Sequence, residues 1–380
     1  MPNLRRRSGR SRSACEQATI ATGTRRVLIS PPGVLLLKLG LFFDLRNPPF
    51  WRRPWTDHYR RNLDLISAAE GMGAASVWFT EHHFLEDGYL PQPLTFAAAV
   101  AARTSRLRIG TAILLAALRH PRHVAEEAAV VDILSGGRLE LGIGAGFAER
   151  EYDAFGADIR RRYTLTDAAV VEIRRLFAEG EVTPPPVQRP LPIWMGYQGP
   201  QGARRAGRLG AGLLSLDPRL LEPYEQGLAE GGHEPSSARM SGMFDIIVAD
   251  DPDEARRRIL PHFVYQLNSY RRMNAGETES YRDLTVEEVS GGAGPKGKIP
   301  GLTVLTPRDV VQAISKRTAG LPVEHVYLWA SIAGMPDDLV ERHVELLFGS
   351  VAPELRAEAE PTAGSTAGST AETGCGTSDD

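Results

Sequence analysis

Short hydrophobic runs alternate with longer amphipathic segments along most of this sequence. The run Lys38–Phe43 is short and apolar, as is typical of a buried strand. In the segment that follows it, at about residues 57–72, Leu63, Ile66 and Ala69 recur at the spacing of one helix face. The pattern therefore predicts a strand followed by a helix.

The same alternation recurs as far as residue 348. It predicts strands at 38–43, 76–80, 107–113, 139–143, 193–195, 211–215, 243–249 and 324–330. It predicts helices at about 57–72, 95–103, 121–135, 165–179, 201–209, 218–230, from 251 onward, 307–316 and 336–348. Eight strand–helix units predict an α/β fold, namely a single-domain (β/α)8 TIM barrel with insertions at residues 37–352.

Three segments depart from this rhythm. Residues 262–302 are polar and glycine-rich, and we expect an insertion or a mobile lid there. Residues 353–380 have low complexity, and residues 1–36 precede the first strand; we expect a disordered tail and a disordered leader. A signal peptide is not expected, because Pro31 and Lys38 interrupt the nearby apolar stretch.

The composition narrows the function and the location. A net charge of −3 and a pI near 6.3 argue against a general nucleic-acid binder. Cys15 and Cys375 lie in the two expected disordered ends and offer no disulfide framework, so we expect a reducing, cytoplasmic location. No apolar run reaches the ~18 residues of a membrane span, so no membrane partner is expected.

Ionisable side chains follow the predicted strand at residues 76–80. Glu81, His82 and His83 come directly after it. Because the chemistry of a (β/α)8 barrel lies at the carboxyl ends of its strands, these side chains are candidates for an active site. The alternative is that the two histidines only end a strand and face water.

A glycine-bearing turn follows the fifth predicted strand and opens a helix. Its residues are Gly196, Tyr197, Gln198 and Gly199. The first N–H groups of a helix have no partner within the helix, so this turn is suited to hold a phosphate. Arg204 and Arg205, one turn further on, would add positive charge; the alternative is an ordinary loop.

The glycines after the fourth predicted strand do not form a dinucleotide-binding motif. Phe147 stands where that motif needs its third glycine. Gly144 and its neighbours therefore give room for a flat ring at the barrel mouth, or simply allow turns. No metal site is expected, because His82 and His83 point to opposite sides of an extended chain and no third ligand is placed by spacing. His120 and His123 form an i, i+3 pair near a helix start, which is common on protein surfaces.

Four motifs resemble those of the bacterial-luciferase-like monooxygenases. They occur in the family order and are Thr80-Glu81-His82-His83-Phe84, Gly110-Thr111-Ala112 running on to Arg119-His120-Pro121, Leu134-Ser135-Gly136-Gly137-Arg138-Leu139, and Pro192-Ile193-Trp194-Met195-Gly196. The resemblance covers roughly residues 36–350. It implies a (β/α)8 barrel that uses reduced FMN or the deazaflavin F420.

The resemblance also implies roles for individual residues. His82 matches the catalytic histidine that luciferase needs for its chemistry with oxygen, and Glu81 is placed beside the cofactor. Thr111–Ala112 matches the site of a non-proline cis peptide below the flavin ring, and Tyr152 matches a tyrosine that contacts flavin. The phosphate loop corresponds to Gly196, Tyr197, Gln198 and Gly199.

One departure from the family concerns the loop after the fourth strand. Gly144 and Ala145 stand where luciferase has a cysteine and an arginine. The reactive thiol and one phosphate-binding cation are therefore missing, which argues against light emission.

Three functions are compatible with these observations. The first is a monooxygenase that oxidises a small organic molecule with reduced FMN and O2, in which His82 is tuned by Glu81 or by burial. The second is an F420-dependent hydride-transfer oxidoreductase, and the third is a non-catalytic flavin-binding protein. By resemblance, we expect a homodimer formed by the helices after strands two and three, and a flavin reductase that supplies reduced flavin.

Overall fold

Eight parallel strands close into a barrel in the computed structural model, which describes residues 37–275, 281–290 and 301–359. The order around the barrel is β1-β10-β7-β6-β5-β4-β3-β2. The strands are β1 (Lys38–Phe43), β2 (Ser76–Phe79), β3 (Arg108–Thr111), β4 (Leu139–Ile143), β5 (Ile193–Met195), β6 (Gly212–Leu214), β7 (Met240–Phe244) and β10 (Val323–Trp329). The prediction of a (β/α)8 barrel is confirmed.

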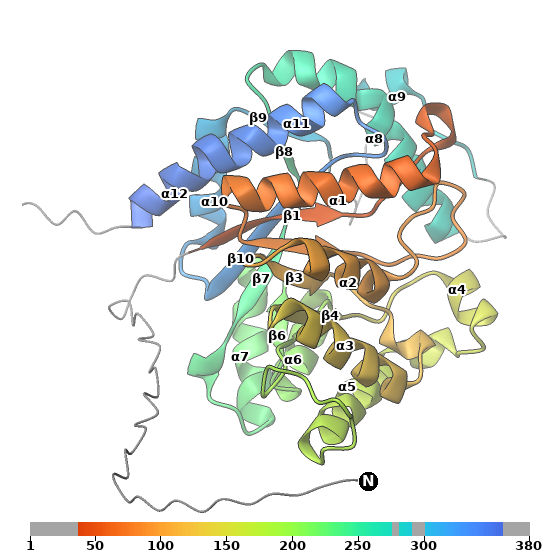
Figure 1. Cartoon of the computed structure of the whole chain (residues 1–380), viewed down its shortest axis with the longest axis vertical. Helices are drawn as coiled ribbons and strands as arrows, with labels where there is room; N and C mark the ends of the chain where they lie inside the picture. The colour runs from red at the N-terminus through yellow and green to blue at the C-terminus, as the bar shows by residue number, and fades with distance from the viewer. Residues whose placement is uncertain (1–36, 276–280, 291–300, 360–380) are drawn as a thin grey trace, which may run out of the picture. The chain divides into compact units, whose positions relative to one another are not determined.

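Helices cover the outside of the barrel (Figure 1). They are α1 (Trp55–Met72), α2 (Pro93–Arg103), α3 (Pro121–Ser135), α4 (Glu149–Ala154), α5 (Arg162–Ala178), α6 (Gly199–Arg208), α7 (Leu221–Glu230), α8 (Pro252–Ala275), α9 (Val286–Ser290), α10 (Pro307–Thr318), α11 (Asp337–Leu346) and α12 (Ala352–Ala359). Short 3-10 helices occupy Pro49–Trp51, Ala116–Leu118, Ile159–Arg161, Pro218–Leu220 and Pro235–Ser237, and a π-helix occupies Leu347–Val351. Helix α1, which follows the first strand, packs beside α11, which follows the last barrel strand.

Alternate residues of each strand serve two separate cores. In β2, Val77 packs with the helices, whereas Trp78 points into the barrel. Trp78 meets Tyr327 of β10 and Trp194 of β5, with ring centroids 4.9 and 6.2 Å apart. A Cβ on Gly110 would lie 2.2 Å from the Trp78 ring, so glycine at this position of β3 gives that ring its space. Aromatic rings therefore fill the inside of the barrel.

The predicted boundaries of the seventh strand are wrong. Residues 243–249 were expected to form one strand, but the barrel strand β7 ends at Phe244. The next residues form β8 (Ile246–Val248), which pairs in parallel with β9 (Thr303–Leu305) in a separate sheet of two strands. A continuous apolar run cannot show where a chain leaves one sheet for another, and Asp245 marks that point.

The expected insertion at residues 262–302 is mostly replaced by regular structure where it is described. Residues 262–275 continue α8, because Phe263, Val264 and Leu267 bury one face of the helix. Residues 286–290 form α9, and residues 302–305 reach β9. The stretches 276–280 and 291–300, where a lid was also expected, lie outside the described residues.

The two ends that were expected to be disordered lie mostly outside the described residues, and the beginning of the tail is helical. Residues 1–36 lie outside the described part of the chain, as do residues 360–380. The tail was expected to begin at residue 353, but α12 extends to Ala359. This helix follows directly from the π-helix, whose Leu347, Phe348 and Val351 are buried.

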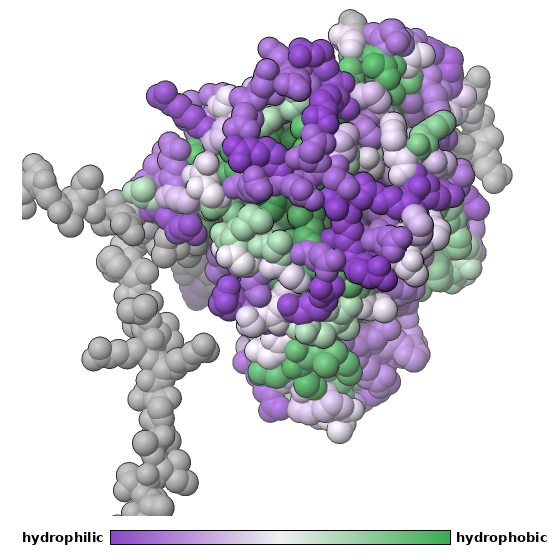
Figure 2. Space-filling view, turned by 45° about the horizontal axis from the view of Figure 1, so that its top comes forward, coloured by the Kyte–Doolittle hydropathy of each residue, from purple (hydrophilic) through white to green (hydrophobic). Residues whose placement is uncertain are grey.

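One face of the molecule is shown by hydropathy in Figure 2. In Figure 2 hydrophilic residues dominate the visible face, and hydrophobic residues gather in a few patches between them. Among the described residues no helix is long and apolar enough to cross a membrane.

Candidate active site

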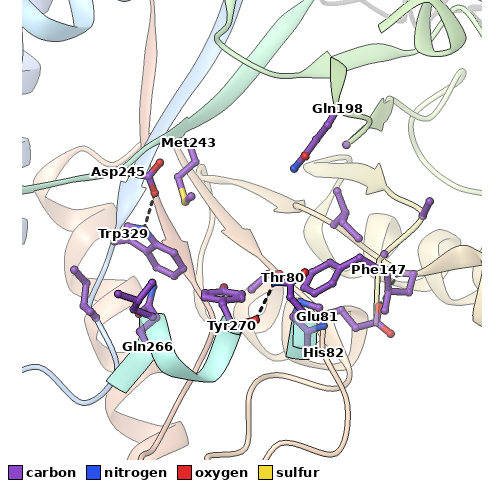
Figure 3. A pocket seen from close by; sticks show the side chains of 18 of the residues that line it. Thr80, Glu81, His82, Phe147, Gln198, Met243, Asp245, Gln266, Tyr270 and Trp329 are labelled. Atoms are coloured by element: carbon purple, nitrogen blue, oxygen red, sulfur yellow. Dashed lines mark hydrogen bonds between the residues drawn. The ribbon is translucent and has the colours of Figure 1, made fainter. Parts of the chain in front are cut away.

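A cavity of about 460 Å³ opens at the carboxyl ends of the barrel strands. Its volume lies within the usual range for sites that bind small molecules, roughly 300–1,000 Å³. Its lining includes Glu81 and His82 after β2, Gly196, Tyr197 and Gln198 after β5, and Trp329 at the end of β10. Glu81, His82, Gln198 and Trp329 face the same space from different walls in Figure 3.

His82 is held by a carboxylate that the sequence analysis did not assign. Its Nδ1 lies 3.0 Å from Oε1 of Glu151, which belongs to α4 in the loop after β4. The same oxygen accepts a hydrogen bond of 2.7 Å from the backbone N–H of His83. Both side chains of the His82–Glu151 pair are buried. Glu151 therefore fixes the orientation of the His82 ring through Nδ1. The other ring nitrogen, Nε2, is the one left to interact with a bound molecule.

Glu81 has a different role from the expected one. Its carboxylate accepts hydrogen bonds from the Leu115 backbone N–H at 2.8 Å and from Arg119, and it contacts His83 Nε2 at 2.7 Å. Glu81 lines the cavity, yet it pairs with His83 and not with His82. The expectation that Glu81 tunes His82 is therefore corrected, because Glu151 occupies that place. The two carboxylates hold the two adjacent histidines separately.

The non-proline cis peptide lies one residue later than expected. It joins Ala112 and Ile113, not Thr111 and Ala112. Thr111 still belongs to β3, and its hydroxyl donates to the Gly142 carbonyl at 2.7 Å. Neither Thr111 nor Ala112 lines the cavity, whereas Ile113 does. Ile113 therefore forms the apolar surface of the cavity next to the place where the cis peptide was expected.

The turn at the start of α6 does reach the cavity. Gly196, Tyr197 and Gln198 line it, and Gly199 is the first residue of α6 with a φ of +72°. The Tyr197 hydroxyl donates to Asp167 Oδ1 at 2.6 Å. The turn is therefore anchored to α5 through Asp167.

The expected extra cations are engaged elsewhere. Arg204 pairs with Glu230, and Arg205 pairs with Asp167. Neither lines the cavity, so the expectation that they add charge to a phosphate site is not supported by their placement. Both lie on α6, and only one face of that helix can turn toward the cavity.

Arg162 is the cation that lines the cavity instead. Its Nε is buried and has no hydrogen-bond partner in the described part of the chain, while its Nη1 donates to the Ile159 carbonyl at 3.2 Å. Its guanidinium lies 4.6 Å from the ring centroid of Tyr163, which also lines the cavity. The sequence offered a signal only in the run of three arginines at 160–162, and spacing does not say which of them turns inward.

Tyr152 supports the site from behind. It is fully buried, it does not line the cavity, and its hydroxyl donates to the Ala145 carbonyl. Ala145 itself lines the cavity. Tyr152 therefore braces the loop after β4 and, in this structure, lies behind the wall on which a cofactor contact was expected.

The wall opposite the turn after β5 comes from α8, β7 and β10. Gln266, Tyr270 and Asn274 lie on successive turns of α8 and line the cavity. Asp245, just after β7, accepts a hydrogen bond of 3.0 Å from Nε1 of Trp329. Burial raises the pKa of Asp245, and the hydrogen bond from Trp329 opposes that rise. Asp245, Gln266, Tyr270 and Asn274 were not singled out from the sequence.

A buried charge cluster lies behind Tyr270. Arg46 donates to Asp87 Oδ2 at 2.6 Å and to Asp44 Oδ2 at 3.2 Å, and it lies 4.9 Å from the Tyr270 ring centroid. Tyr89 joins the cluster to the cavity, because its hydroxyl contacts the Tyr270 hydroxyl at 3.1 Å. Two carboxylates thus share one guanidinium, and burial raises the pKa of Asp44 to about 6.

The lining suits a flat ring system with an acidic tail. Ile113 and Leu115 offer an apolar surface, and Arg162 keeps an unpaired buried N–H. The start of α6 adds backbone N–H groups near Gln198. Within the described residues, no group of three or more His, Cys, Asp or Glu side chains is placed to hold a metal ion.

Comparison with known proteins identifies the family. Residues 37–345 match the model of the luciferase-like monooxygenases. The uncharacterised protein y4wF of Sinorhizobium fredii is 31% identical over 236 residues, which are 56% of this chain and 68% of that protein. An F420-dependent glucose-6-phosphate dehydrogenase of Kineococcus radiotolerans is 32% identical over 224 residues, 51% of this chain and 65% of that enzyme.

A solved structure agrees with this assignment. The monooxygenase RslO1 from Streptomyces bottropensis superposes with a TM-score of 0.66 at 27% identity, covering 84% of this chain and 99% of that one. The chain belongs to the luciferase-like monooxygenase family, as the sequence motifs predicted, and it is an oxidoreductase of that family. The Kineococcus radiotolerans enzyme is F420-dependent, and the oxygenating constituent of 3,6-diketocamphane monooxygenase from Pseudomonas putida, which has a similar fold at 17% identity and a TM-score of 0.63, was solved in complex with FMN.

Proposed function

We propose that this chain is a monooxygenase that uses reduced FMN and O2 to oxidise a small organic molecule. One observation carries this proposal: His82, which is paired with the buried Glu151, and Arg162, whose Nε has no hydrogen-bond partner among the described residues, line the same cavity as the turn after β5. An ionisable donor and an anion site on one cavity are what a phosphate-bearing redox cofactor needs.

The residues that would hold the cofactor divide into two groups. Arg162 and the N–H groups at the start of α6 would bind the phosphate, since a guanidinium and a helix N-terminus both attract anions. Ile113 and Leu115 would support the flat ring. When bound, reduced FMN supplies the electrons that reduce O2.

His82 would move a proton at Nε2. Its Nδ1 faces the Glu151 carboxylate, so the proton on Nδ1 is held there, and Nε2 is the nitrogen that would accept a proton from a bound molecule and then give it back. Tyr89 packs edge-on against the His82 ring, with centroids 4.8 Å apart, and helps to keep water away from it. Glu151 acts as the positioning residue for His82.

F420 is the second candidate cofactor. The similarity to an F420-dependent dehydrogenase favours it, and the same cavity would serve it. In that case hydride transfer replaces the reaction with oxygen, and His82 would exchange a proton with the substrate.

A titration separates the two cofactors. The protein is mixed with FMN and with F420, each oxidised and reduced, and binding is followed by fluorescence; oxygen uptake and loss of F420 absorbance are then recorded. Tight binding of reduced FMN with oxygen uptake supports the proposal. Tight binding of F420 without oxygen uptake would replace it with the dehydrogenase function.

The remaining expectations extend the same proposal. A separate flavin reductase would supply reduced FMN, and the protein would work in the cytoplasm. A homodimer would form through α3, where Val130, Ile133 and Leu134 are exposed large hydrophobic side chains.

A further inference from the structure

We infer that the wall formed by Asp245, Gln266 and Trp329 is a substrate subsite that selects a flat, largely apolar ring carrying a hydroxyl group. This inference deepens the proposed function, because it takes the bound ring to be the molecule that the enzyme oxidises. It concerns the side of the cavity away from the turn after β5, as Gln198 and Asp245 face each other across the space in Figure 3.

Asp245 provides the first hydrogen-bond acceptor of this subsite. It stands between β7 and β8, at the point where the chain leaves the barrel. Within the described residues its hydrogen bond is the one of 3.0 Å from Trp329 Nε1 to Oδ1, so Oδ2 remains able to accept from a ligand. The residue lines the cavity, and burial raises its pKa. A carboxylate in such a place gains from a further donor.

Gln266 provides the second acceptor. Its side chain is nearly fully buried, with 6% of the residue exposed, and its Oε1 has no hydrogen-bond partner among the described residues. An unpaired buried amide oxygen is unfavourable, and a ligand that donates a hydrogen bond to it would remove that penalty. Gln266 lies beside Trp329 on the same side of the cavity as Asp245 (Figure 3).

The rest of this wall is apolar or aromatic. Met243, Phe263, Leu267 and Ile332 line it together with the Trp329 ring. The Trp329 ring is fixed from behind by Phe42, which packs edge-on with centroids 4.8 Å apart. A flat apolar ring would therefore find contact on several sides, and the two acceptors would orient it through one substituent.

The subsite is distinct in chemistry from the anion site. Arg162, which lines the cavity near Tyr163, suits a phosphate, whereas Asp245 would repel one. An anionic group and a hydroxyl-bearing ring would thus take separate ends of the same cavity. This division leaves Gly196–Gln198 for the cofactor and the α8 wall for the substrate.

Two probes of equal ring size test the inference. Binding of 2-naphthol and of 2-methoxynaphthalene, which lacks the donor, is measured by calorimetry in the presence of saturating FMN and in its absence. We expect the wild-type protein to bind 2-naphthol about tenfold more tightly, as one hydrogen bond to a buried carboxylate predicts. Equal affinity for the two probes in the wild-type protein would overturn the inference.

Variants locate the preference. In the double variant D245N/Q266M we expect the two affinities to agree within about threefold, at nearly constant volume. The amide at 245 would keep its one oxygen on Trp329 Nε1 and present N–H groups to the ligand, and the side chain at 266 would have no oxygen. The control variant D250N changes an exposed aspartate that pairs with Arg342, and it should keep the wild-type preference. A preference for 2-naphthol that survives in the double variant would show that the hydroxyl is recognised elsewhere, and the inference would be lost.

Two further readouts keep this test separate from folding and from the proposed function. Q266M alone should not lower the midpoint of thermal unfolding, because it removes an unpaired buried polar atom; a clear loss of stability would assign Gln266 to the fold and not to a ligand. The cofactor titration of the wild-type protein reports on the proposed function alone. A preference for 2-naphthol without binding of FMN or F420 would retain the subsite and reject the cofactor.

Discussion

The orientation of the His82 ring depends on Glu151 more than on the residues next to His82 in the sequence. The pair joins the end of β2 to α4, and both side chains are buried. Because the ring is held through Nδ1, its orientation follows from the position of the α4 loop. Replacing Glu151 would therefore disturb catalysis without touching the substrate.

The variant H82A tests the catalytic assignment. We expect turnover with the productive cofactor to fall by about 10²–10⁴-fold, which is the usual contribution of a positioned acid or base. Cofactor affinity should change by only a few-fold, because Arg162 and the α6 turn would still hold the phosphate. The measurement is steady-state turnover beside a fluorescence titration of the cofactor. Wild-type turnover in H82A would remove His82 from the mechanism.

The cluster of Asp44, Arg46 and Asp87 makes the stability of the protein depend on pH. Burial raises the pKa of Asp44 to about 6, above the ordinary value of 3.8, so the folded protein binds a proton at a higher pH than the unfolded chain does. A raised carboxyl pKa means that stability increases as the pH falls through 6. We expect the free energy of unfolding of the wild-type protein, relative to D44N, to increase by about 1 kcal/mol from pH 7 to pH 5.

Urea denaturation of both proteins across this pH range measures the difference. The comparison with D44N cancels the other titrating groups as far as they are independent of Asp44. A difference that stays constant with pH would show that Asp44 keeps its ordinary pKa in the folded protein.

Single residues of the site were only partly predictable from the sequence. His82, Gly196, Tyr197 and Gln198 follow strands directly, and the barrel topology alone brings them to one cavity. Residues such as Glu151 and Arg162 come from loops and helix starts, where the backbone path decides which side chain turns inward. That path is set by tertiary packing, and no local spacing encodes it.

Among the elements, α2, α3 and the segment before β3 are joined by one side chain. Arg138 donates to the carbonyls of Ala101, Thr104, Leu107 and Ser135 and to the Thr104 hydroxyl, at distances between 2.5 and 3.1 Å. It thereby satisfies carbonyls at the ends of two helices that have no partner within the helix. Burial lowers the pKa of Arg138.

The variant R138K should lower the free energy of unfolding by about 2–4 kcal/mol. A single ammonium group has at most three donors, so it leaves buried carbonyls unpaired, at about 1–3 kcal/mol each. The exposed Arg103, which pairs with Asp64, provides the control, and R103K should change stability by less than about 1 kcal/mol. Chemical denaturation compares the two, and equal small effects would contradict the role given to Arg138.

Prediction succeeded for elements whose boundaries carry a local signal. Pro121 and Gly136 delimit α3, which begins and ends where it was expected. It failed where tertiary pairing decides the boundary, as at Asp245 between β7 and β8. The burial of Asp132 on α3 likewise depends on tertiary structure, because its carboxylate accepts hydrogen bonds from the backbone N–H and the side-chain amide of Gln188.

At the scale of the whole molecule, the barrel was predictable because its rhythm repeats. Each strand–helix unit repeats the same hydrophobic pattern, so an error at one boundary does not change the topology. Assembly is different, because it depends on which exposed side chains meet a second copy. The best indication is on α3, where Val130, Ile133 and Leu134 are 46%, 38% and 52% exposed.

We expect the protein to be a homodimer and L134E to convert it to a monomer. A charge placed in an apolar interface is left without a partner and opposes association. Sedimentation of the wild-type protein and the variant measures the mass directly. M72E changes another exposed apolar residue, at the end of α1, and should remain dimeric; a monomeric wild-type protein would reject this interface.

The long helix α8 has a consequence for how this protein can change. Gln266, Tyr270 and Asn274 recur along one stripe of that helix, while His82 and Arg162 belong to other parts of the barrel rim. On the proposed substrate wall, exchanges at Gln266 and Asn274 would alter which compounds are accepted and leave His82 and Arg162 in place, whereas Tyr270 contacts Tyr89, which packs against His82. New specificities can therefore arise, in nature or in the laboratory, through the turns of a single helix.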